Sequence, residues 1–407
     1  MVAKLGFSLP IGPFHPALKE PVALKFEIEG ERIVKVEPAL GHAHRGIEKL
    51  AENRTWFQFL FISEHICGIC SGAHNGCYAQ LAERIYQIEP TPRGDFLRTW
   101  IWEWERIHSH LLWIGVLAHE MALDTLFMYT WRDRELVMDV FEKVSGRRVV
   151  YSFNTIGGVR RDVSEDVLKE IKKICDYLIE RAKYYEKLIS TDRTILARTR
   201  NVGYLSKNDA INLCAVGPTT RASGVKRDVR YEEPYSVYPE SPFEIVVTEE
   251  GDAWAKTLVR IREIIVSAEI CKWVCDNLPK GPIKKNIPPM KAPPPGEAIS
   301  RVEAPRGELF YYGKSNGTPR PERLKVRTPT LANIPAVCKM LEGGYIADIP
   351  IVFASIDPCI ACMDRIVFYD TNRDRKFVMT WNELRRYSRL WYKKHMNDPE
   401  IKSRWKI

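Results

Sequence analysis

Two Cys-x-x-Cys pairs near opposite ends of the chain constrain its fold more than any other feature. Cys67 and Cys70 form the first pair, Cys359 and Cys362 form the second, and almost three hundred residues separate them. A two-residue spacer lets both sulfurs face one ion, because the intervening backbone turns and its amides can donate to the thiolates. Four thiolates are a soft ligand set that suits zinc, iron–sulfur or nickel. A zinc knuckle is normally a short, loop-rich module, so we expect a deep site that both ends of the fold share.

The composition is that of a folded protein with reduced thiols. The chain has 407 residues, 45% of them hydrophobic, which is enough for a sizeable core. Its ten cysteines, without a secretory signal, favour metal chemistry over a disulfide framework. The formal charge of +9 arises from Lys and Arg interleaved with acids, so we expect docking sites for acidic partners and no nucleic-acid binding. No apolar stretch reaches the roughly 18 residues of a membrane span, so membrane attachment is expected to come from partner subunits.

The periodicity of apolar residues predicts an α+β fold that is mainly α, in four segments. Residues 1–45 form an N-terminal β region, because alternation around a Gly-Glu turn predicts a hairpin at 24–37, which a short strand at 4–9 could join. Residues 46–279 form a helical core, with helices expected at 46–63, 70–86, 93–131, 135–144, 164–190 and 252–278. The proline-rich residues 280–298 predict an extended connector. Residues 299–407 form a smaller α+β region, in which the apolar run 351–356 is expected to be a strand that delivers the second Cys pair.

Several sequence blocks, in order along nearly the whole chain, carry a resemblance to known proteins. They are Gly12-Pro13-Phe14-His15-Pro16, His44-Arg45-Gly46-Ile47-Glu48-Lys49, Glu64-His65-Ile66-Cys67-Gly68-Ile69-Cys70, Ile156-Gly157-Gly158-Val159, Gly217-Pro218, Arg221-Ala222-Ser223-Gly224 and Asp357-Pro358-Cys359-Ile360-Ala361-Cys362. Together they resemble the large subunit of energy-converting, membrane-bound [NiFe]-hydrogenases (group 4), which is related to the quinone-site 49 kDa subunit of complex I. Blocks in order are more specific than either Cys pair alone.

The resemblance implies a nickel–iron centre held by the four cysteines. Cys67 and Cys359 would bind nickel as terminal ligands, and Cys70 and Cys362 would bridge to an iron that carries carbon monoxide and two cyanides. The implied activity is reversible formation and oxidation of dihydrogen, and soft, anionic sulfurs make the nickel electron-rich enough for this chemistry. The protein must also supply a base, an exit for protons and a cage for the diatomic ligands.

Further residues match positions around that centre. Arg306, in Glu303-Ala304-Pro305-Arg306-Gly307-Glu308-Leu309, is similar to the family segment that suspends a guanidinium over the open metal face, whereas arginine is more commonly used in surface salt bridges. Thr330 matches a position that holds a cyanide ligand, although a plain turn explains it equally well. His74 would place an imidazole beside the bridging sulfur of Cys70, or be a core histidine. Asp357 supports the second pair as part of its motif.

Two glutamates match family positions for protons and for a second metal. Glu20 occupies the place of the proton-accepting glutamate, and a carboxylate is the usual choice for such a relay. Glu48 matches a glutamate that binds magnesium in many relatives. The histidine that follows the last Cys pair in those relatives is replaced here by Met363-Asp364-Arg365. This replacement argues against magnesium and against C-terminal processing.

The remaining cysteines and a histidine pair are expected to be structural. Cys271 and Cys275 share a helix face without another ligand nearby, so we expect apolar packing, as for Cys77, Cys175, Cys214 and Cys338. His108 and His110 should lie on opposite faces of one helix and cannot bind one ion together.

The chain lacks a ferredoxin-like Cys run, so we expect no iron–sulfur cluster within it. Electrons would then pass through a small subunit with a [4Fe-4S] cluster and a further iron–sulfur subunit. The family adds antiporter-like membrane subunits for ion translocation, and ferredoxin, formate or a CO dehydrogenase module as electron source. The expected location is peripheral, on the cytoplasmic side of the membrane, with the basic, aromatic residues 381–407 as a docking surface or a solvated helix.

Two other functions remain open from the sequence. A metal-free, complex-I-like coupling subunit would bind quinone, but it would have no use for four retained cysteines. A structural-zinc scaffold is disfavoured by Arg306 in its motif and by the long separation of the Cys pairs.

Overall fold

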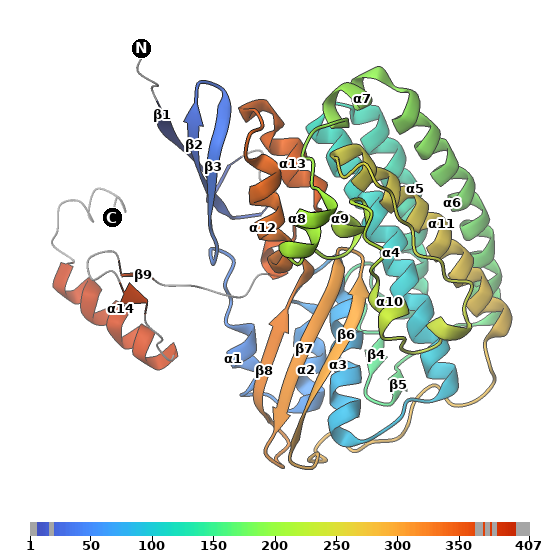
Figure 1. Cartoon of the computed structure of the whole chain (residues 1–407). Coiled ribbons are helices and arrows are strands. Elements are labelled where there is room, and N and C mark those ends of the chain that lie inside the picture. Colours follow the sequence, from blue (N-terminus) through green and yellow to red (C-terminus); the bar gives the residue numbers. More distant parts are fainter. Residues whose placement is uncertain (1–5, 16–19, 363–368, 371–374, 377–380, 396–407) are drawn as a thin grey trace. The chain divides into compact units, whose positions relative to one another are not determined.

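The computed structural model describes residues 6–15, 20–362, 369–370, 375–376 and 381–395 (Figure 1). The chain divides into two compact units, Met1–Arg365 and Ile366–Ile407. The second unit contributes the short antiparallel strands β9 (Tyr369–Asp370) and β10 (Arg375–Lys376) and the helix α14 (Trp381–His395). Long helices with small sheets confirm the predicted mainly α, α+β class. The four-segment division made from the sequence stays a prediction.

The N-terminal sheet is antiparallel, with the order β1 (Gly6–Ile11), β2 (Ala23–Glu29) and β3 (Arg32–Ala39). Alternation along β2 buries Leu24, Phe26 and Ile28 on one face while the residues between them stay exposed. These side chains belong to a small core shared with the helix α12 (Pro329–Leu341). The predicted hairpin and its additional strand are therefore confirmed.

The helical core is built around four long helices that run side by side in Figure 1, namely α4 (Pro92–Glu120), α5 (Asp124–Ser145), α6 (Glu165–Thr191) and α11 (Ala253–Asn277). Shorter elements complete it: α1 (Ile47–Ala51), α2 (Trp56–Glu64), α3 (Ser71–Tyr86), α7 (Arg193–Thr199), α8 (Lys207–Asn212), α9 (Pro218–Arg221), α10 (Val229–Glu232), the 3-10 turn η1 (Tyr238–Glu240) and the strands β4 (Asn154–Thr155) and β5 (Gly158–Val159). Within the described residues, no helix combines the length and the hydrophobicity needed to cross a membrane.

Two predicted helices are wrong in their extent. The helix expected at 46–63 is broken before α2, because Thr55 is an N-cap whose hydroxyl accepts a hydrogen bond from the amide of Gln58. The helix expected at 93–131 ends at Glu120, and Ala122 adopts a positive φ of 60° before α5 begins. No Gly or Pro marks that turn, so the helical spacing of apolar residues continues across it. The sequence therefore predicted one helix where the structure has two.

The second Cys pair follows a helix, so the strand predicted at 351–356 is wrong. The segment forms α13 (Ile349–Ser355), whose residues apart from Pro350 are all buried. Pro350 lies in the first turn, where its fixed φ favours a helix. A short apolar run buried on several sides does not reveal its period, which explains the error.

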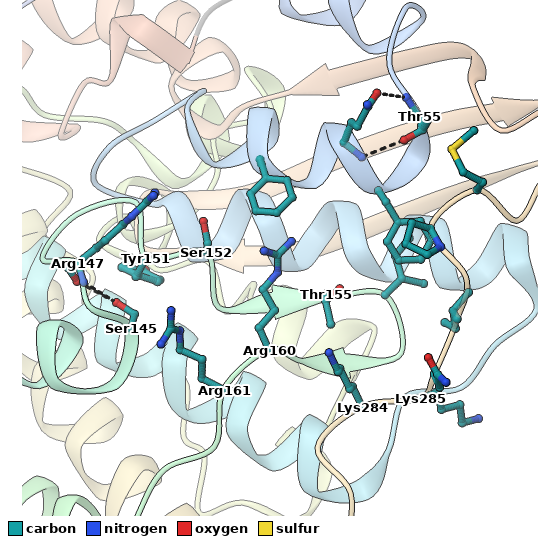
Figure 2. A pocket seen from close by; sticks show the side chains of 18 residues that line it. Thr55, Ser145, Arg147, Tyr151, Ser152, Thr155, Arg160, Arg161, Lys284 and Lys285 are labelled. Atoms are coloured by element: carbon teal, nitrogen blue, oxygen red, sulfur yellow. Dashed lines mark hydrogen bonds between the residues drawn. The ribbon is translucent and has the colours of Figure 1, made fainter.

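A three-stranded antiparallel sheet, β6 (Gly296–Ala304), β7 (Gly307–Ser315) and β8 (Pro321–Arg327), packs on α3. The 3-10 turns η2 (Ile346–Asp348) and η3 (Ile360–Cys362) flank α13. The proline-rich segment before β6 is extended, as predicted, and runs beside the β4–β5 hairpin (Figure 2). The amide of Val159 donates to the carbonyl of Ile283 at 2.9 Å, and the amide of Lys285 donates to that of Gly157 at 3.1 Å.

Candidate metal centre

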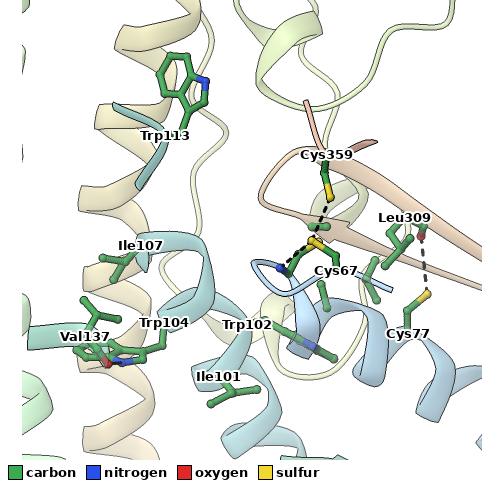
Figure 3. Packing of buried hydrophobic residues seen from close by; sticks show 14 of the residues in the cluster. Cys67, Cys77, Ile101, Trp102, Trp104, Ile107, Trp113, Val137, Leu309 and Cys359 are labelled. Atoms are coloured by element: carbon green, nitrogen blue, oxygen red, sulfur yellow. Dashed lines mark hydrogen bonds between the residues drawn. The ribbon is translucent and has the colours of Figure 1, made fainter. Parts of the chain in front are cut away.

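The two Cys pairs meet in the interior, where α3 begins and where the chain leaves α13 (Figure 3). The sulfur of Cys359 lies 3.3 Å from that of Cys67 and 2.6 Å from that of Cys362. The sulfurs of Cys67, Cys70 and Cys362 all lie within 4.8 Å of one another. All four side chains are buried, and none forms a disulfide. The four sulfurs therefore surround one point.

Backbone amides shape both sulfur-bearing turns. The amides of Ile69 and Cys70 each lie 3.4 Å from the sulfur of Cys67 and donate to it. The hydroxyl of Thr330 accepts a hydrogen bond from the amide of Cys359 at 3.0 Å, in a buried position. The predicted site residue Thr330 thus lies at the centre and holds the backbone of the second pair.

Arg45 joins the two turns, and it was not singled out from the sequence. Its guanidinium donates to the carbonyls of His65 and Ile66, at 2.9 and 2.8 Å, and to that of Ala361 at 2.8 Å. One side chain therefore ties the residues before Cys67 to the second pair. Arg45 belongs to a recognised sequence block, but its three carbonyl partners become visible only in the fold.

Arg306 and Asp357 form a buried ion pair beside the sulfurs. The Arg306 guanidinium donates to the carboxylate of Asp357 at 2.7 Å and to the carbonyl of Asp357 at 2.8 Å. Burial opposes the charge of Arg306, but the Asp357 carboxylate and the Cys67 sulfur outweigh it and raise the pKa well above its usual value. The turn that carries Arg306 is pressed against Gly217, because a Cβ on Gly217 would lie 2.4 Å from the Cα of Gly307.

Glu20, which lies before β2, and His74, on α3, both lie next to the second Cys pair. The carboxylate of Glu20 accepts a hydrogen bond from the amide of Ala361 at 2.8 Å, and its pKa is raised, chiefly by burial. The imidazole of His74 lies 3.9 Å from the sulfur of Cys362 and 2.8 Å from the hydroxyl of Tyr311. Burial lowers the pKa of His74 to about 4, so the ring is neutral at pH 7. It is both a core histidine and a neighbour of a sulfur.

A small cavity of about 100 Å³ adjoins the centre. Its charged lining residues are Glu20, Glu120, Arg306 and Asp357, and Trp113 and Phe353 are among its apolar lining. A small, mainly apolar cavity next to buried charged groups limits the access of water to them.

Glu48 lies away from the sulfurs. Its carboxylate pairs with the Lys325 ammonium at 2.6 Å and accepts a hydrogen bond from the amide of Val326 at 2.9 Å, which fastens α1 to β8. Within the part of the chain that is described, the sulfurs of Cys67, Cys70 and Cys362 form the one cluster of three or more His, Cys, Asp or Glu ligand atoms. The segment Met363-Asp364-Arg365 lies outside the described residues.

Glu105 is a second residue that sequence reasoning missed. Its carboxylate accepts hydrogen bonds from the amides of Gly72 and Ala73, at 2.5 and 3.1 Å, and from the hydroxyl of Tyr151. It therefore caps the first turn of α3, directly after Cys70. Burial raises the pKa of Glu105 to about 8. A lone acid in a tryptophan-rich helix gives no sequence signal for such a role.

The two histidines of α4 contact different helices, as their spacing requires. His108 accepts a hydrogen bond from the Nε of Arg134 on α5 at 2.8 Å, and His110 lies 2.8 Å from the carboxylate of Glu263 on α11. Cys271 is buried in the main core.

The donor set fits a soft metal. A metal with sulfur bonds of about 2.3 Å holds neighbouring sulfurs about 3.8 Å apart. The 3.3 Å between Cys67 and Cys359 is near that value, whereas the 2.6 Å between Cys359 and Cys362 would have to widen on binding. The neighbouring Cys359, Cys362 and Cys70 thiols donate to the sulfur of Cys67 and lower its pKa well below the usual value. The hydrogen bonds among the sulfurs act in both directions, but together with burial and the neighbouring Cys67 charge they raise the pKa values of Cys70, Cys359 and Cys362 well above the usual value. A cation bound by the four sulfurs would favour their ionised form.

Comparisons with known proteins identify the family of this chain. The family model for the 49 kDa subunit of respiratory-chain NADH dehydrogenase matches residues 120–294 and 286–365. The membrane-bound hydrogenase subunit alpha of Pyrococcus furiosus is 40% identical, over 93% of this chain and 92% of the relative. The carbon monoxide-induced hydrogenase of Rhodospirillum rubrum is 39% identical, over 88% of this chain and 99% of the relative.

Other similar proteins belong to complexes with different activities. An NADH-quinone oxidoreductase subunit of Thermodesulfovibrio yellowstonii is 37% identical, over 89% of this chain and 98% of the relative. A chain of the membrane-bound sulfane sulfur reductase, an archaeal respiratory membrane complex, superposes with a TM-score of 0.85 at 32% identity, over 90% of this chain and 100% of that chain. This chain therefore belongs to the family of the 49 kDa subunit of respiratory-chain NADH dehydrogenase, in which membrane-bound hydrogenase subunits are among its relatives.

Proposed function

We propose that this chain is the catalytic subunit of a membrane-associated [NiFe]-hydrogenase that forms and oxidises dihydrogen reversibly. The observation that carries the proposal is the meeting of four buried cysteine sulfurs beside Arg306 and Glu20. A structural zinc site needs neither a buried guanidinium nor a titratable carboxylate in an adjoining cavity, whereas hydrogen chemistry needs both charge stabilisation and a proton acceptor.

Cys67, Cys70, Cys359 and Cys362 would together hold a nickel–iron centre whose iron carries carbon monoxide and two cyanides. When bound, this group supplies the Lewis acidity and the redox change that split or form dihydrogen. Thr330 holds the amide of Cys359, and His74 holds its neutral imidazole against Cys362. These contacts keep the sulfurs in one geometry.

Proton transfer falls to Glu20. Its carboxylate borders the cavity, and the amide of Ala361 fixes its orientation toward the second Cys pair. Because burial raises its pKa, Glu20 holds a proton more readily than an exposed glutamate does, which suits a group that alternately accepts and releases one. Asp357 pairs with Arg306 and so keeps the guanidinium fixed at the cavity wall.

The relatives support a membrane complex around this subunit. One relative is a membrane-bound hydrogenase subunit, and the similar solved chain belongs to a respiratory membrane complex. We propose peripheral attachment on the cytoplasmic side, a small subunit with a [4Fe-4S] cluster, a further iron–sulfur subunit and antiporter-like membrane subunits that translocate ions. Ferredoxin, formate or a CO dehydrogenase module would supply electrons.

A metal-free quinone-coupling subunit is the second candidate, because the chain is 37% identical to a subunit of an NADH-quinone oxidoreductase. Metal content and the infrared spectrum of the purified complex separate the two functions. We expect about one nickel per chain, iron beyond that of the clusters, and carbon monoxide and cyanide bands that disappear in Cys362→Ser.

Cys214→Ser is the matched control, since Cys214 is an exposed cysteine outside the cluster of four sulfurs. It should retain nickel and the bands. Zinc, or no metal, with a silent spectrum in the unaltered complex would refute the hydrogenase function.

A further inference from the structure

Arg306 lies at the tip of a tight hairpin turn in the interior of the protein. Ala304 and Gly307 are paired across β6 and β7, so Pro305 and Arg306 form the loop between the two strands. The tip of a hairpin is ordinarily exposed and mobile. This tip is buried, with 2% of the Arg306 surface exposed, and it brings the guanidinium to Asp357. The position of the guanidinium therefore depends on what holds the turn.

Arg106, in the middle of α4, holds the backbone just before this turn. Its guanidinium donates to the carbonyl of Glu303 at 2.7 Å and to the carbonyl of Ala304 at 3.3 Å. The side chain is fully buried. A guanidinium offers five donors in a rigid plane, so one side chain can fix two successive peptide groups. Arg106 thus ties the end of β6 to a long helix of the core.

The Arg106 guanidinium is itself held in place. The Glu103 carboxylate, one turn earlier on α4, accepts a hydrogen bond from the Nε of Arg106 at 3.2 Å. Glu103 also accepts from Arg230 at 3.0 Å and from the hydroxyl of Ser267 at 2.6 Å. These contacts restrict the Arg106 guanidinium to one orientation toward the turn.

Two further contacts act on the same strand end from other elements. Arg221, the last residue of α9, donates to the carboxylate of Glu303 at 2.8 Å. The amide of Glu303 donates to the hydroxyl of Tyr235 at 3.0 Å. Both contacts stop at Glu303. Among these three anchoring side chains, Arg106 is the one that reaches the Ala304 carbonyl, two residues before Arg306.

The same helix also contacts the Arg306 guanidinium directly. The hydroxyl of Ser109, three residues after Arg106 on α4, accepts a hydrogen bond from the Nη1 of Arg306 at 3.3 Å. Helix α4 therefore positions both the backbone that carries Arg306 and one edge of its guanidinium. A misplacement of about 1 Å near a reacting centre can reduce a rate by about 100-fold.

We propose that Arg106 is a positioning residue for Arg306, which fixes the hairpin turn so that the guanidinium stays beside the four sulfurs. The described hydrogen bonds of Arg106 go to Glu103 and to the strand end before the turn, and none goes to a cysteine sulfur. Arg106 therefore acts through the turn. Its effect on hydrogen chemistry rests on the proposed function, whereas the anchoring of the turn does not.

Arg98 supplies a matched control on the same helix. It is fully buried, pairs with the carboxylate of Glu83 at 2.9 Å, and donates to the carbonyls of Thr155 at 2.6 Å and Gly158 at 3.0 Å. Arg98 thus makes the same kinds of contact as Arg106, one carboxylate and two carbonyls, but at the β4–β5 hairpin. The loss of buried hydrogen bonds alone would affect both variants alike.

The test compares Arg106→Lys with Arg98→Lys in the purified complex, each alone and each combined with Arg306→Lys. Lysine keeps the positive charge beside Glu103, but an ammonium lacks the planar fork that reaches two carbonyls. The first measurement is hydrogen exchange, by mass spectrometry, of the peptide 300–309 that contains the turn. The second is the rate of hydrogen evolution, with thermal unfolding and nickel content as checks of folding.

We expect exchange at 300–309 to be about tenfold faster in Arg106→Lys, because the turn opens more readily without its anchor, and unchanged in Arg98→Lys. Hydrogen evolution should fall about tenfold in Arg106→Lys. The same change should cost less than about twofold in the Arg306→Lys background, where no guanidinium is left to misplace. Arg98→Lys should have the same effect in both backgrounds.

A milder variant covers the case in which Arg106→Lys prevents assembly of the complex. Glu103→Gln loosens the Arg106 guanidinium without removing it and should accelerate exchange at 300–309 in the same direction. Unchanged exchange of this peptide, or equal acceleration in Arg98→Lys, would overturn the inference. An equal loss of hydrogen evolution with and without Arg306 would also overturn it, since Arg106 would then act by another route.

The outcomes separate this inference from the proposed function. Unchanged exchange at 300–309 with intact infrared bands would refute the role of Arg106 alone. Faster exchange in Arg106→Lys, with no nickel and a silent spectrum in the unaltered complex, would leave the anchoring of the turn standing and refute the hydrogenase.

Discussion

The hydrogen bond between Thr330 and the amide of Cys359 offers a sharp test of how the second Cys pair is held. Both residues are buried, and the hydroxyl oxygen lies 3.0 Å from the amide nitrogen. Thr330→Val preserves the shape of the side chain but removes the acceptor, and an unsatisfied buried amide costs about 1–3 kcal/mol. Thr330→Ser keeps the acceptor and loses one methyl group, worth about 0.8 kcal/mol. We therefore expect the valine variant to be the less stable of the two.

Urea unfolding followed by circular dichroism and by tryptophan fluorescence measures the difference, provided that both probes report one transition with an unchanged slope. Nickel content of the purified complex should fall in the valine variant and not in the serine variant, because only the former loosens the backbone of Cys359. If serine destabilises as much as valine, packing of the methyl group rather than the hydrogen bond holds this turn, and the reasoning is refuted.

Three further perturbations follow from the structure. Burial keeps Glu105 protonated up to a pKa of about 8, so its contribution to stability is complete below its ordinary pKa of 4.5 and is lost as the pH rises through 8. The loss is on the order of 5 kcal/mol, and Glu105→Gln should flatten the pH dependence of the unfolding free energy; an unchanged slope would contradict it. Gly158→Ala should lower the melting temperature more than Gly146→Ala, because a Cβ meets the Ile283 carbonyl at 2.1 Å in the first case and nothing within 4 Å in the second; equal melting temperatures would count against the close approach. Glu20→Gln should reduce hydrogen evolution about 100-fold or more while the infrared bands persist, whereas full activity would remove Glu20 from the proton path.

Local patterns predicted local structure well. The alternation at 24–37 predicted β2 and β3, and the proline run predicted the extended connector, because side-chain period and backbone restrictions act between near neighbours. The same reasoning failed at 351–356, where burial on several sides hides the period, and at Ala122, where a positive φ ends α4 without a glycine.

The candidate metal centre, too, was predicted from the sequence only in part. The residue types and their two-residue spacing indicated a soft metal site, and family blocks pointed to Arg306 and Glu20. Neither source indicated Arg45, which clamps both sulfur-bearing turns through backbone carbonyls, or Glu105, which caps α3. Glu48 pairs with Lys325 instead of joining a metal cluster among the described residues.

The sequence by itself determined which ligands are available, the soft character of the site, and the helix that begins at the first Cys pair. Only the tertiary structure decided that the four sulfurs meet, that Arg306 pairs with Asp357 beside them, and that Arg106 reaches the turn that carries Arg306. The physical reason is that spacing along a helix or turn is set by backbone geometry, whereas a contact across almost three hundred residues depends on how every intervening element packs.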